Sequence, residues 1–234
     1  MLEIKDYNSS ILHEISFSLQ EGENLIILGQ NGAGKSTLAK VLANLIENTK
    51  VKINDELLDD MASSKRAKLI NYIPPKLEIF DEYVTLREFL ELSFVNSVDN
   101  NKIDEIIKLL HVRKLEDKYC KSFSSGEKQL LLLASAIIHD AKITIFDELT
   151  ANLDINRLKE VYDIFNSKLL QQKIIITHNL DLAYALKYKV LFLNDGIIEF
   201  YGEHDEFFNN TNLKRFYNES IQKLNNHLVV NLWV

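Results

Sequence analysis

One glycine-rich stretch of the sequence has the residue types that bind a phosphate group. Residues 29 to 37 read Gly-Gln-Asn-Gly-Ala-Gly-Lys-Ser-Thr and follow directly on the apolar run from Leu25 to Leu28. Glycines let the backbone wrap closely around an anion, and the N-terminus of a following helix adds its dipole. A loop of this pattern uses its lysine to reach the outer phosphates and its hydroxyl to ligate Mg²⁺. The predicted binding residues are Gly29, Gln30, Asn31, Gly32, Ala33, Gly34, Lys35, Ser36 and Thr37, with Ser36 on the metal.

An apolar run that ends in two acids can serve the same ligand. Residues 143 to 148 read Ile-Thr-Ile-Phe-Asp-Glu. Charge at the end of a buried strand costs free energy unless a cation meets it, so paired carboxylates there indicate a site. Asp147 is predicted to join the Mg²⁺ shell and Glu148 to polarise a water as general base. The alternative is a solvated turn.

Two aromatic side chains are further candidates for nucleotide contact. His178 follows the apolar run from Ile174 to Ile176 and could sense a terminal phosphate, although a lone histidine is usually structural. Tyr7 could stack on an adenine ring, because an aromatic side chain offers a large contact area at little entropic cost. It could equally be a core residue at a strand end, and the sequence leaves both readings open.

A second helix start also carries small polar residues. Residues 122 to 129 read Ser-Phe-Ser-Ser-Gly-Glu-Lys-Gln and precede an apolar helical stripe. Such a start can bind an anion, but Ser-Ser-Gly before a helix is more often a simple cap. The residues concerned are Ser124, Ser125, Gly126 and Glu127.

The elements that must position these groups alternate between strands and helices. Residues 1 to 28 show the alternation of strands, including Ile11, and residues 51 to 58 suggest a short strand and a turn. Residues 69 to 73 predict another strand, which Pro74 and Pro75 must end because proline cannot donate to a ladder. After the loop, apolar residues at helical spacing predict a helix with the stripe Leu38, Val41, Leu42, Leu45 and Ile46.

From residue 76 to about residue 140 the apolar period is helical. Residues 85 to 88 have the pattern of a capping box, residues 103 to 110 form a second stripe entered at Asp99, and residues 130 to 138 form a third. The sequence therefore predicts an α/β fold: a phosphate-loop core with a mainly parallel sheet, an N-terminal antiparallel portion and an inserted helical subdomain. Residues 1–75 and 141–234 form the core lobe, and residues 76–140 form the helical subdomain.

The C-terminal third continues the core. Asp154 is expected to cap a helix, and Asn194-Asp195-Gly196 to form the turn of a hairpin. Residues 204 to 227 suggest short amphipathic helices, and the apolar tail from residue 228 to 234 has no evident partner.

Composition limits the function classes. The 234 residues have a net charge of -7, which argues against a nucleic-acid surface, and the single Cys120 rules out an internal disulfide framework. The first residues lack the pattern of a signal peptide. The longest apolar stretch, residues 130 to 138, is far short of the roughly 18 to 20 residues that cross a bilayer. Any membrane role is therefore expected to be peripheral, through a partner.

The order of these motifs resembles the ATP-binding cassette ATPases, the motor subunits of ABC transporters. The resemblance extends over nearly the whole chain and implies ATP and Mg²⁺ as cofactors. It implies that residues 29 to 37 are the Walker A loop and that Asp147 and Glu148 are the Walker B acid and the general base. Its further assignments are Tyr7 as the adenine-stacking aromatic, Asn152-Leu153-Asp154 as the D-loop, His178 as the switch histidine and residues 123 to 127 as the signature.

The resemblance also implies partners and a location. In this family the signature of one subunit closes over the ATP of a second copy, which gives a two-fold dimer with composite sites. Lys35, Glu148 and His178 would carry catalysis in each site. The expected partners are transmembrane permease subunits and a solute-binding protein, with no nucleic acid. The expected location is cytoplasmic, peripheral on the inner face of the cell membrane.

Four positions in three motifs depart from the family pattern. The family's elbow glutamine, which contacts the metal and the permease, aligns with Pro75, whose ring can neither ligate Mg²⁺ nor donate a hydrogen bond. The signature has Ser125 for its first glycine and Glu127 for its glutamine. In the Walker B motif, Leu149 takes the place of the family's proline. Pro75, Ser125 and Glu127 motivate an alternative function, a weakly hydrolysing regulatory or binding module, whereas the intact Glu148 and His178 oppose it.

A shorter resemblance bears on the transported substrate. Residues 66 to 74, Arg-Ala-Lys-Leu-Ile-Asn-Tyr-Ile-Pro, are similar to the segment before the elbow in importers of iron-siderophore, haem and cobalamin type chelates. This similarity favours import of an iron or other metal-chelate compound as the function.

Overall fold

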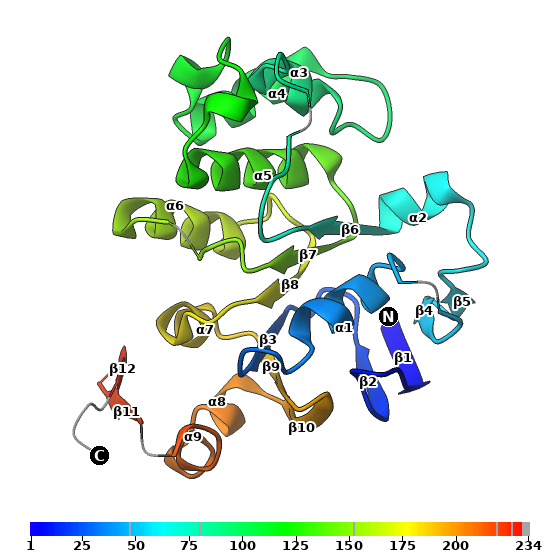
Figure 1. The fold of residues 1–234 in the computed structure, drawn as a ribbon, viewed down its shortest axis with the longest axis vertical. Helices are drawn as coiled ribbons and strands as arrows, with labels where there is room; N and C mark the ends of the chain where they lie inside the picture. Colours follow the sequence, from blue (N-terminus) through cyan, green and yellow to red (C-terminus); the bar gives the residue numbers. More distant parts are fainter. Residues whose placement is uncertain (47, 80, 152, 219, 226, 231–234) are drawn as a thin grey trace.

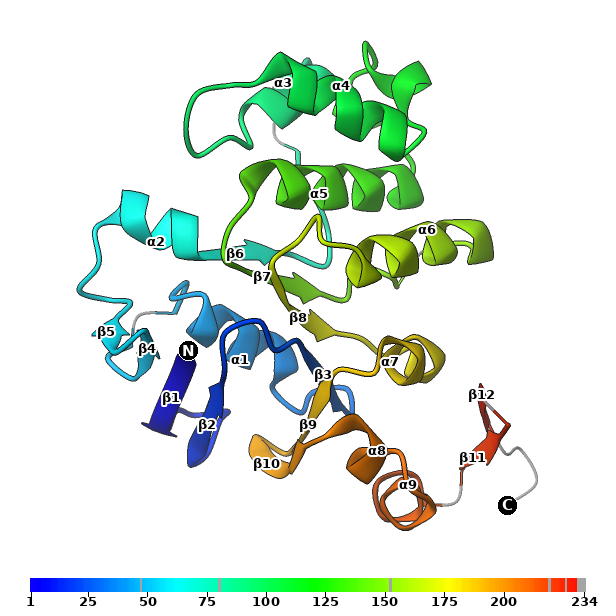
Figure 2. The same ribbon diagram turned by 180° about the vertical axis from the view of Figure 1, so that it is seen from behind.

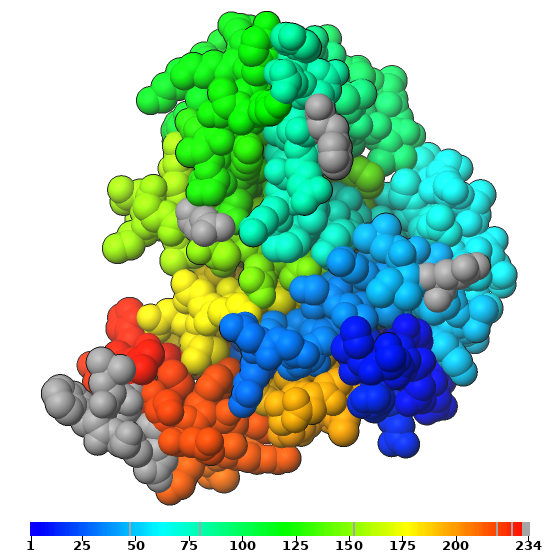
Figure 3. All heavy atoms as spheres, in the orientation of Figure 1, coloured from blue at the N-terminus to red at the C-terminus, as the bar shows by residue number. Residues whose placement is uncertain are grey.

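The computed structural model describes residues 1–46, 48–79, 81–151, 153–218, 220–225 and 227–230. A six-stranded sheet forms the centre, with a small antiparallel sheet beside it near the N-terminus (Figure 1). Helices α3 to α5 lie at one end of the molecule and the C-terminal helices at the other, as the view from behind also shows (Figure 2). In the space-filling view the same two groups occupy opposite ends (Figure 3).

The central sheet is parallel except at one edge. Its order is β10-β9-β3-β8-β7-β6, and the β9–β10 pair is antiparallel. Parallel strands are covered on both faces, which is why β7 and β8 are buried at every position. The strands are β3 (Leu25–Gly29), β6 (Ile70–Ile73), β7 (Ile143–Asp147), β8 (Gln172–Ile176), β9 (Lys189–Asn194) and β10 (Ile197–Gly202).

The N-terminal residues form a separate antiparallel sheet in the order β2-β1-β4-β5. The bounds are β1 (Leu2–Tyr7), β2 (Ile15–Leu19), β4 (Val51–Ile53) and β5 (Glu56–Leu57). With the mainly parallel central sheet, this confirms the predicted fold class. The prediction that Ile11 belongs to a strand is wrong, because the Ser9 hydroxyl accepts the amide hydrogens of Ile11 and Leu12 and holds them in a turn.

Two hydrophobic clusters cover opposite faces of the central sheet. Alternate residues of β3 face opposite sides, as the period of a strand requires: Ile26 and Leu28 join one cluster, and Leu25 and Ile27 join the other. One cluster packs the sheet against α1 (Lys35–Leu42) and the antiparallel sheet. The other packs it against α5 (Ser125–His139), α6 (Ile155–Asn166) and α7 (Leu180–Leu186).

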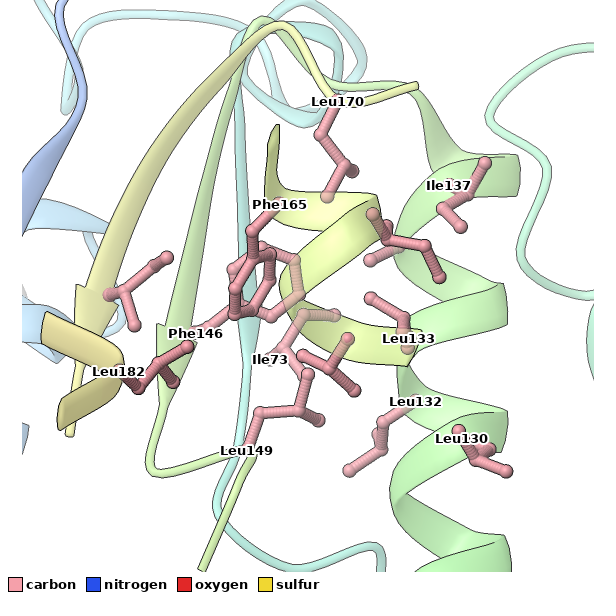
Figure 4. Packing of buried hydrophobic residues seen from close by; sticks show 14 of the residues in the cluster. Ile73, Leu130, Leu132, Leu133, Ile137, Phe146, Leu149, Phe165, Leu170 and Leu182 are labelled. Atoms are coloured by element: carbon pink, nitrogen blue, oxygen red, sulfur yellow. The ribbon is translucent and has the colours of Figure 1, made fainter. Parts of the chain in front are cut away.

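The second cluster is built around an aromatic pair. The rings of Phe146 on β7 and Phe165 on α6 lie 5.0 Å apart, centroid to centroid, and leucines of α5 lie on one side of them (Figure 4). This cluster continues without a break from the sheet into α3 (Leu86–Glu91) and α4 (Asn100–Leu109). The predicted division into residues 1–75 with 141–234 and residues 76–140 stays a prediction.

Local helix signals are confirmed where caps are involved. Thr85 and Glu88 form the predicted capping box of α3, Asp99 caps α4 and Asp154 caps α6. The hairpin of β9 and β10 is also confirmed, and Asp195 and Gly196 both have positive φ at its turn.

Other boundaries differ from prediction. Helix α1 ends at Leu42, because Asn44 adopts a left-handed conformation and the Asn48 side chain donates to the Val41 carbonyl. Leu45 and Ile46, predicted as part of its stripe, therefore lie outside the helix, and Leu45 is 61% exposed. Residues before β6 form α2 (Ser63–Leu69), which was not predicted because it buries no residue and so has no apolar stripe.

The C-terminal prediction of helices to residue 227 is wrong beyond Tyr217. After α8 (His204–Phe207) and α9 (Asn210–Tyr217), the chain forms a hairpin of β11 (Ile221–Leu224) and β12 (His227–Val230). The tail does have a partner, because the Leu228 amide donates to Asp181 on α7 at 2.9 Å. Residues 231–234 lie outside the described residues. Two short 3-10 turns, Arg113–Leu115 and Cys120–Ser122, complete the elements. No helix within the described ranges is both long and apolar enough to cross a membrane.

Candidate nucleotide site

The phosphate loop joins β3 to α1 with a conformation that only glycine allows at two points. Gly29 has φ 151°, and a Cβ atom there would lie 2.1 Å from the carbonyl oxygen of Leu193. Gly34, the N-cap residue of α1, has φ 98°, and a Cβ there would lie 2.9 Å from the Leu12 side chain. The loop is thus seated against β9 and the N-terminal segment, with the first turn of α1 above it. This is the loop-to-helix arrangement at which the sequence predicts an anion site, and binding there stays a prediction.

The Lys35 side chain lies inside the loop and is hydrogen-bonded to its backbone. Its side chain is 5% exposed, and Nζ donates to the carbonyl oxygens of Gly29 at 3.0 Å and Gln30 at 2.8 Å. Burial lowers the pKa of Lys35, while the charges of Glu148 and Asp147 oppose that shift. The ammonium therefore lies within the loop and in the field of both acids.

Asp147 lies at the end of β7, fully buried beside the loop. The Ser36 hydroxyl donates to its Oδ1 at 3.1 Å, and the Tyr72 hydroxyl donates to its Oδ2 at 2.9 Å. Burial, together with the Asp147 carboxylate, raises the pKa of Tyr72 well above its usual value. A hydroxyl and a carboxylate in contact are hard oxygen ligands of the kind Mg²⁺ prefers, so these residues fit a magnesium ion. Tyr72 was missed by sequence reasoning, because nothing in its local pattern indicates contact with a residue 75 positions away.

Glu148 and His178 come together at the ends of neighbouring strands. Oε1 of Glu148 lies 2.8 Å from Nε2 of His178. Glu148 has φ 53°, and its amide donates to the Ile176 carbonyl at 3.0 Å, so the chain turns sharply after β7. Glu148 borders the same pocket as Asn31, Gly32, Gly34, Lys35, Ser36 and Thr37 of the loop. The structure thus unites four predicted site elements: the loop, both acids and the histidine.

Tyr7 and Ile11, which both precede the loop, lie in different surroundings: Tyr7 is in the core and Ile11 is at the loop pocket. Tyr7 is 8% exposed and belongs to the core cluster beneath α1, so its surroundings match the core alternative. Ile11 is 47% exposed and lines the pocket at the loop. Sequence reasoning missed Ile11 because it placed this residue inside a strand.

At the helix start of residues 124 to 127, the side chains of Ser124 and Glu127 occupy backbone amide hydrogens of the same segment. Ser124 accepts from the Glu127 amide at 3.3 Å, and Glu127 Oε2 accepts from the Ser124 amide at 2.8 Å. The Ser124 amide lowers the pKa of Glu127, so the carboxylate stays ionised near neutral pH. The simple-cap alternative therefore describes the observed contacts. Ser125 borders a pocket with Pro75, Lys76, Leu77, Lys128 and Gln129, and no described residue of 124–127 lines the loop pocket.

The segment after Glu148 is described in part. Asp154 uses its side chain to accept the Arg157 amide at 3.0 Å, as an N-cap. Leu153 borders a second pocket with Glu148, Thr177 and His178. Asn152, which the resemblance places in the D-loop, lies outside the described residues.

A phosphate loop between a central parallel strand and a helix, with acids at the end of a nearby strand, defines a phosphate-loop nucleotide-binding protein. A family model described as "ABC transporter" matches residues 12–151. The chain therefore belongs to the ABC transporter family and carries its ATP-binding domain, an ATPase.

Individual relatives are similar over most of this chain. A zinc import ATP-binding protein of Buchnera aphidicola is 31% identical over 194 residues, 81% of this chain and 77% of the relative. An ABC transporter ATP-binding protein of Clostridium tetani is 31% identical over 80% of this chain, which spans 44% of that relative's length. The fold is also similar to the dimeric structure of MJ0796, a bacterial ABC transporter cassette, with a TM-score of 0.74 and 20% sequence identity. The superposition covers 87% of this chain and 99% of the MJ0796 chain.

Proposed function

We propose that this chain binds and hydrolyses Mg-ATP to power a transporter, with Lys35, Glu148 and His178 as its catalytic residues. The observation that carries the proposal is that Ser36 and Glu148 both line the loop pocket, with Asp147 hydrogen-bonded to Ser36 and His178 in contact with Glu148. These groups come from three different strand ends. The buried Asp147 carboxylate accepts from Ser36 and Tyr72, and a bound cation would offset the cost of burying its charge.

The proposed roles follow from the contacts. The loop amides of residues 29 to 37 and the Lys35 ammonium bind the phosphates and stabilise the charge that develops on them. Ser36 and Asp147 would hold Mg²⁺, which neutralises phosphate charge when bound. Glu148 accepts a proton from the attacking water, and His178, in contact with its carboxylate, orients it. The proposed base or ribose contact is Ile11 rather than Tyr7.

A second copy of the chain is the proposed partner in hydrolysis. Residues 124 to 127 of one copy would act on the ATP of the other, with Asp154 at the interface, as the resemblance implies. The absence of residues 124 to 127 from the loop pocket of their own copy supports this arrangement. Dimeric structures of a cassette with this fold give it further support.

Glu127 is expected to weaken that dimer by its charge. Glu127→Gln keeps an acceptor for the Ser124 amide but removes a negative charge near the partner's phosphates. We expect ATP-dependent dimerisation to strengthen about 1.5- to 5-fold, since an interaction between two exposed charges is worth about 0.2–1 kcal/mol. Light scattering across protein concentration at saturating Mg-ATP measures this change.

Glu88→Gln is the matched control, because Glu88 forms the same capping box with Thr85 on α3. It should leave dimerisation unchanged while altering the same kind of cap. Equal effects of the two substitutions would show that cap strength, not charge at the interface, sets the dimer affinity.

The proposed transport function is import of an iron or other metal-chelate compound. The cassette would lie on the cytoplasmic face of the cell membrane, bound to transmembrane permease subunits, with a solute-binding protein in the same system and no nucleic acid. The segment from Arg66 to Pro74 supports the metal-chelate class. The 31% identity to a zinc import protein supports import of a metal more generally.

Uptake by cells tests the substrate class. Labelled ferric siderophore, haem and cobalamin are supplied to cells that carry either the wild-type gene or Glu148→Gln at the same locus. We expect uptake of one compound to fall to background in the variant. Unchanged uptake of all three, with zinc uptake lost, would assign the chain to free metal ions instead.

A slowly hydrolysing regulatory module is the second candidate. Pro75 favours this second function. It aligns with the family's elbow glutamine, and its ring can neither ligate Mg²⁺ nor donate a hydrogen bond from the pocket that it borders with Ser125. Phosphate release by the wild-type dimer at a rate equal to that of Lys35→Met would support this second function.

A further inference from the structure

We propose that Tyr72 is a positioning residue for the magnesium ligand, acting through its hydrogen bond to Asp147. The Tyr72 hydroxyl holds Oδ2 of Asp147, so that Oδ1 remains directed at Ser36. This inference rests on the proposed function of the site.

Strand pairing explains why Tyr72 reaches this carboxylate. Tyr72 on β6 lies opposite Ile145 on β7, two residues before Asp147. Residues two apart on a strand share a face, and a long aromatic side chain spans the diagonal to such a neighbour. The Tyr72 ring packs on the core cluster beneath α1, which fixes the hydroxyl at the strand end.

The carboxylate needs this second donor because it is wholly removed from water. Asp147 is 0% exposed, and among the described residues Ser36 and Tyr72 are the side chains that donate to it. A buried oxygen without a donor loses its hydration without compensation. A donor on the outer oxygen also limits rotation of the carboxylate. Groups that hold metal ligands in this way typically change metal affinity 10- to 100-fold when removed.

The position of Tyr72 in the chain adds a structural link. Strand β6 runs directly into Pro74 and Pro75, which lead to the helices at the far end of the molecule (Figure 1). Pro75 has no hydrogen to donate, so the Tyr72 hydroxyl is the polar group by which this strand contacts the metal ligand. Displacement of β6 would therefore change the orientation of Asp147.

The test compares Tyr72→Phe with Tyr201→Phe in the full chain. Tyr201 is also partly buried and donates its hydroxyl to the Ser18 carbonyl at 2.6 Å, away from the loop. Affinity for a fluorescent ATP analogue is measured in EDTA and then as a function of Mg²⁺ concentration. For Tyr72→Phe we expect unchanged affinity in EDTA, and a Mg²⁺ concentration for half-maximal enhancement that is about 10- to 100-fold higher. Tyr201→Phe should match the wild type in both.

Each result decides between separate claims. A Tyr72→Phe variant with the Mg²⁺ dependence of the wild type would overturn the positioning role and leave the proposed function intact. Equal loss of nucleotide affinity with and without Mg²⁺ would also overturn the positioning role, because a loss that does not depend on Mg²⁺ indicates a general structural defect. Wild-type protein whose nucleotide affinity does not respond to Mg²⁺ at all would overturn the proposed function itself.

Discussion

Replacing Glu148 with glutamine is expected to reduce ATP hydrolysis by about 10³-fold, within the range that a positioned general base contributes. The amide of Glu148→Gln cannot accept the proton of the attacking water, although it can still contact His178 by a hydrogen bond. The loop, Lys35 and Ser36 are unchanged, so ATP binding should be retained. The ATP-bound dimer should therefore accumulate. Single-turnover phosphate release measures the first effect, and light scattering under saturating Mg-ATP measures the second.

A control for this substitution is Glu21→Gln. Glu21 is a carboxylate in an ion pair with Lys142, outside the loop pocket. Its replacement should leave both phosphate release and dimerisation at wild-type values. A Glu148→Gln protein that stays monomeric at saturating Mg-ATP, or that hydrolyses at the wild-type rate, would remove Glu148 from the role of general base.

Replacing Lys35 with methionine is expected to reduce hydrolysis by about 10²- to 10³-fold, the cost of losing one preorganised charge-stabilising donor. The substitution removes the ammonium that lies within the loop and keeps most of the aliphatic stem. ATP affinity should also fall, because the outer phosphates lose a cationic partner. Steady-state phosphate release and equilibrium binding of a fluorescent ATP analogue measure the two effects.

Lys173→Met provides a matched control. Lys173 is another buried lysine, 3% exposed, whose Nζ donates to a backbone carbonyl and whose pKa burial also lowers. Its removal should affect stability but not nucleotide binding. Equal phosphate release by Lys35→Met and the wild type would exclude hydrolysis at this site.

Short-range patterns determined much of this protein from the sequence alone. The loop from Gly29 to Thr37, the caps at Thr85 and Asp154 and the turn at Asp195-Gly196 depend on residues within a few positions of one another. Glycine conformations, capping side chains and apolar periodicity act locally, so their effects can be predicted without knowing the fold. The burial of the apolar runs in β7 and β8 likewise follows from their composition, whereas the burial of Gln172 and Lys173 does not.

The tertiary structure decided which of these groups meet. The Glu148–His178 contact requires β7 and β8 to lie in register, and the Tyr72–Asp147 hydrogen bond requires β6 beside β7. Ile11 reaches the pocket and Tyr7 the core because of how the segment before β2 turns. Parallel pairing joins strands that are far apart in sequence, and its register depends on the packing of the whole core. No local pattern contains that information, so these contacts could be found only in the fold.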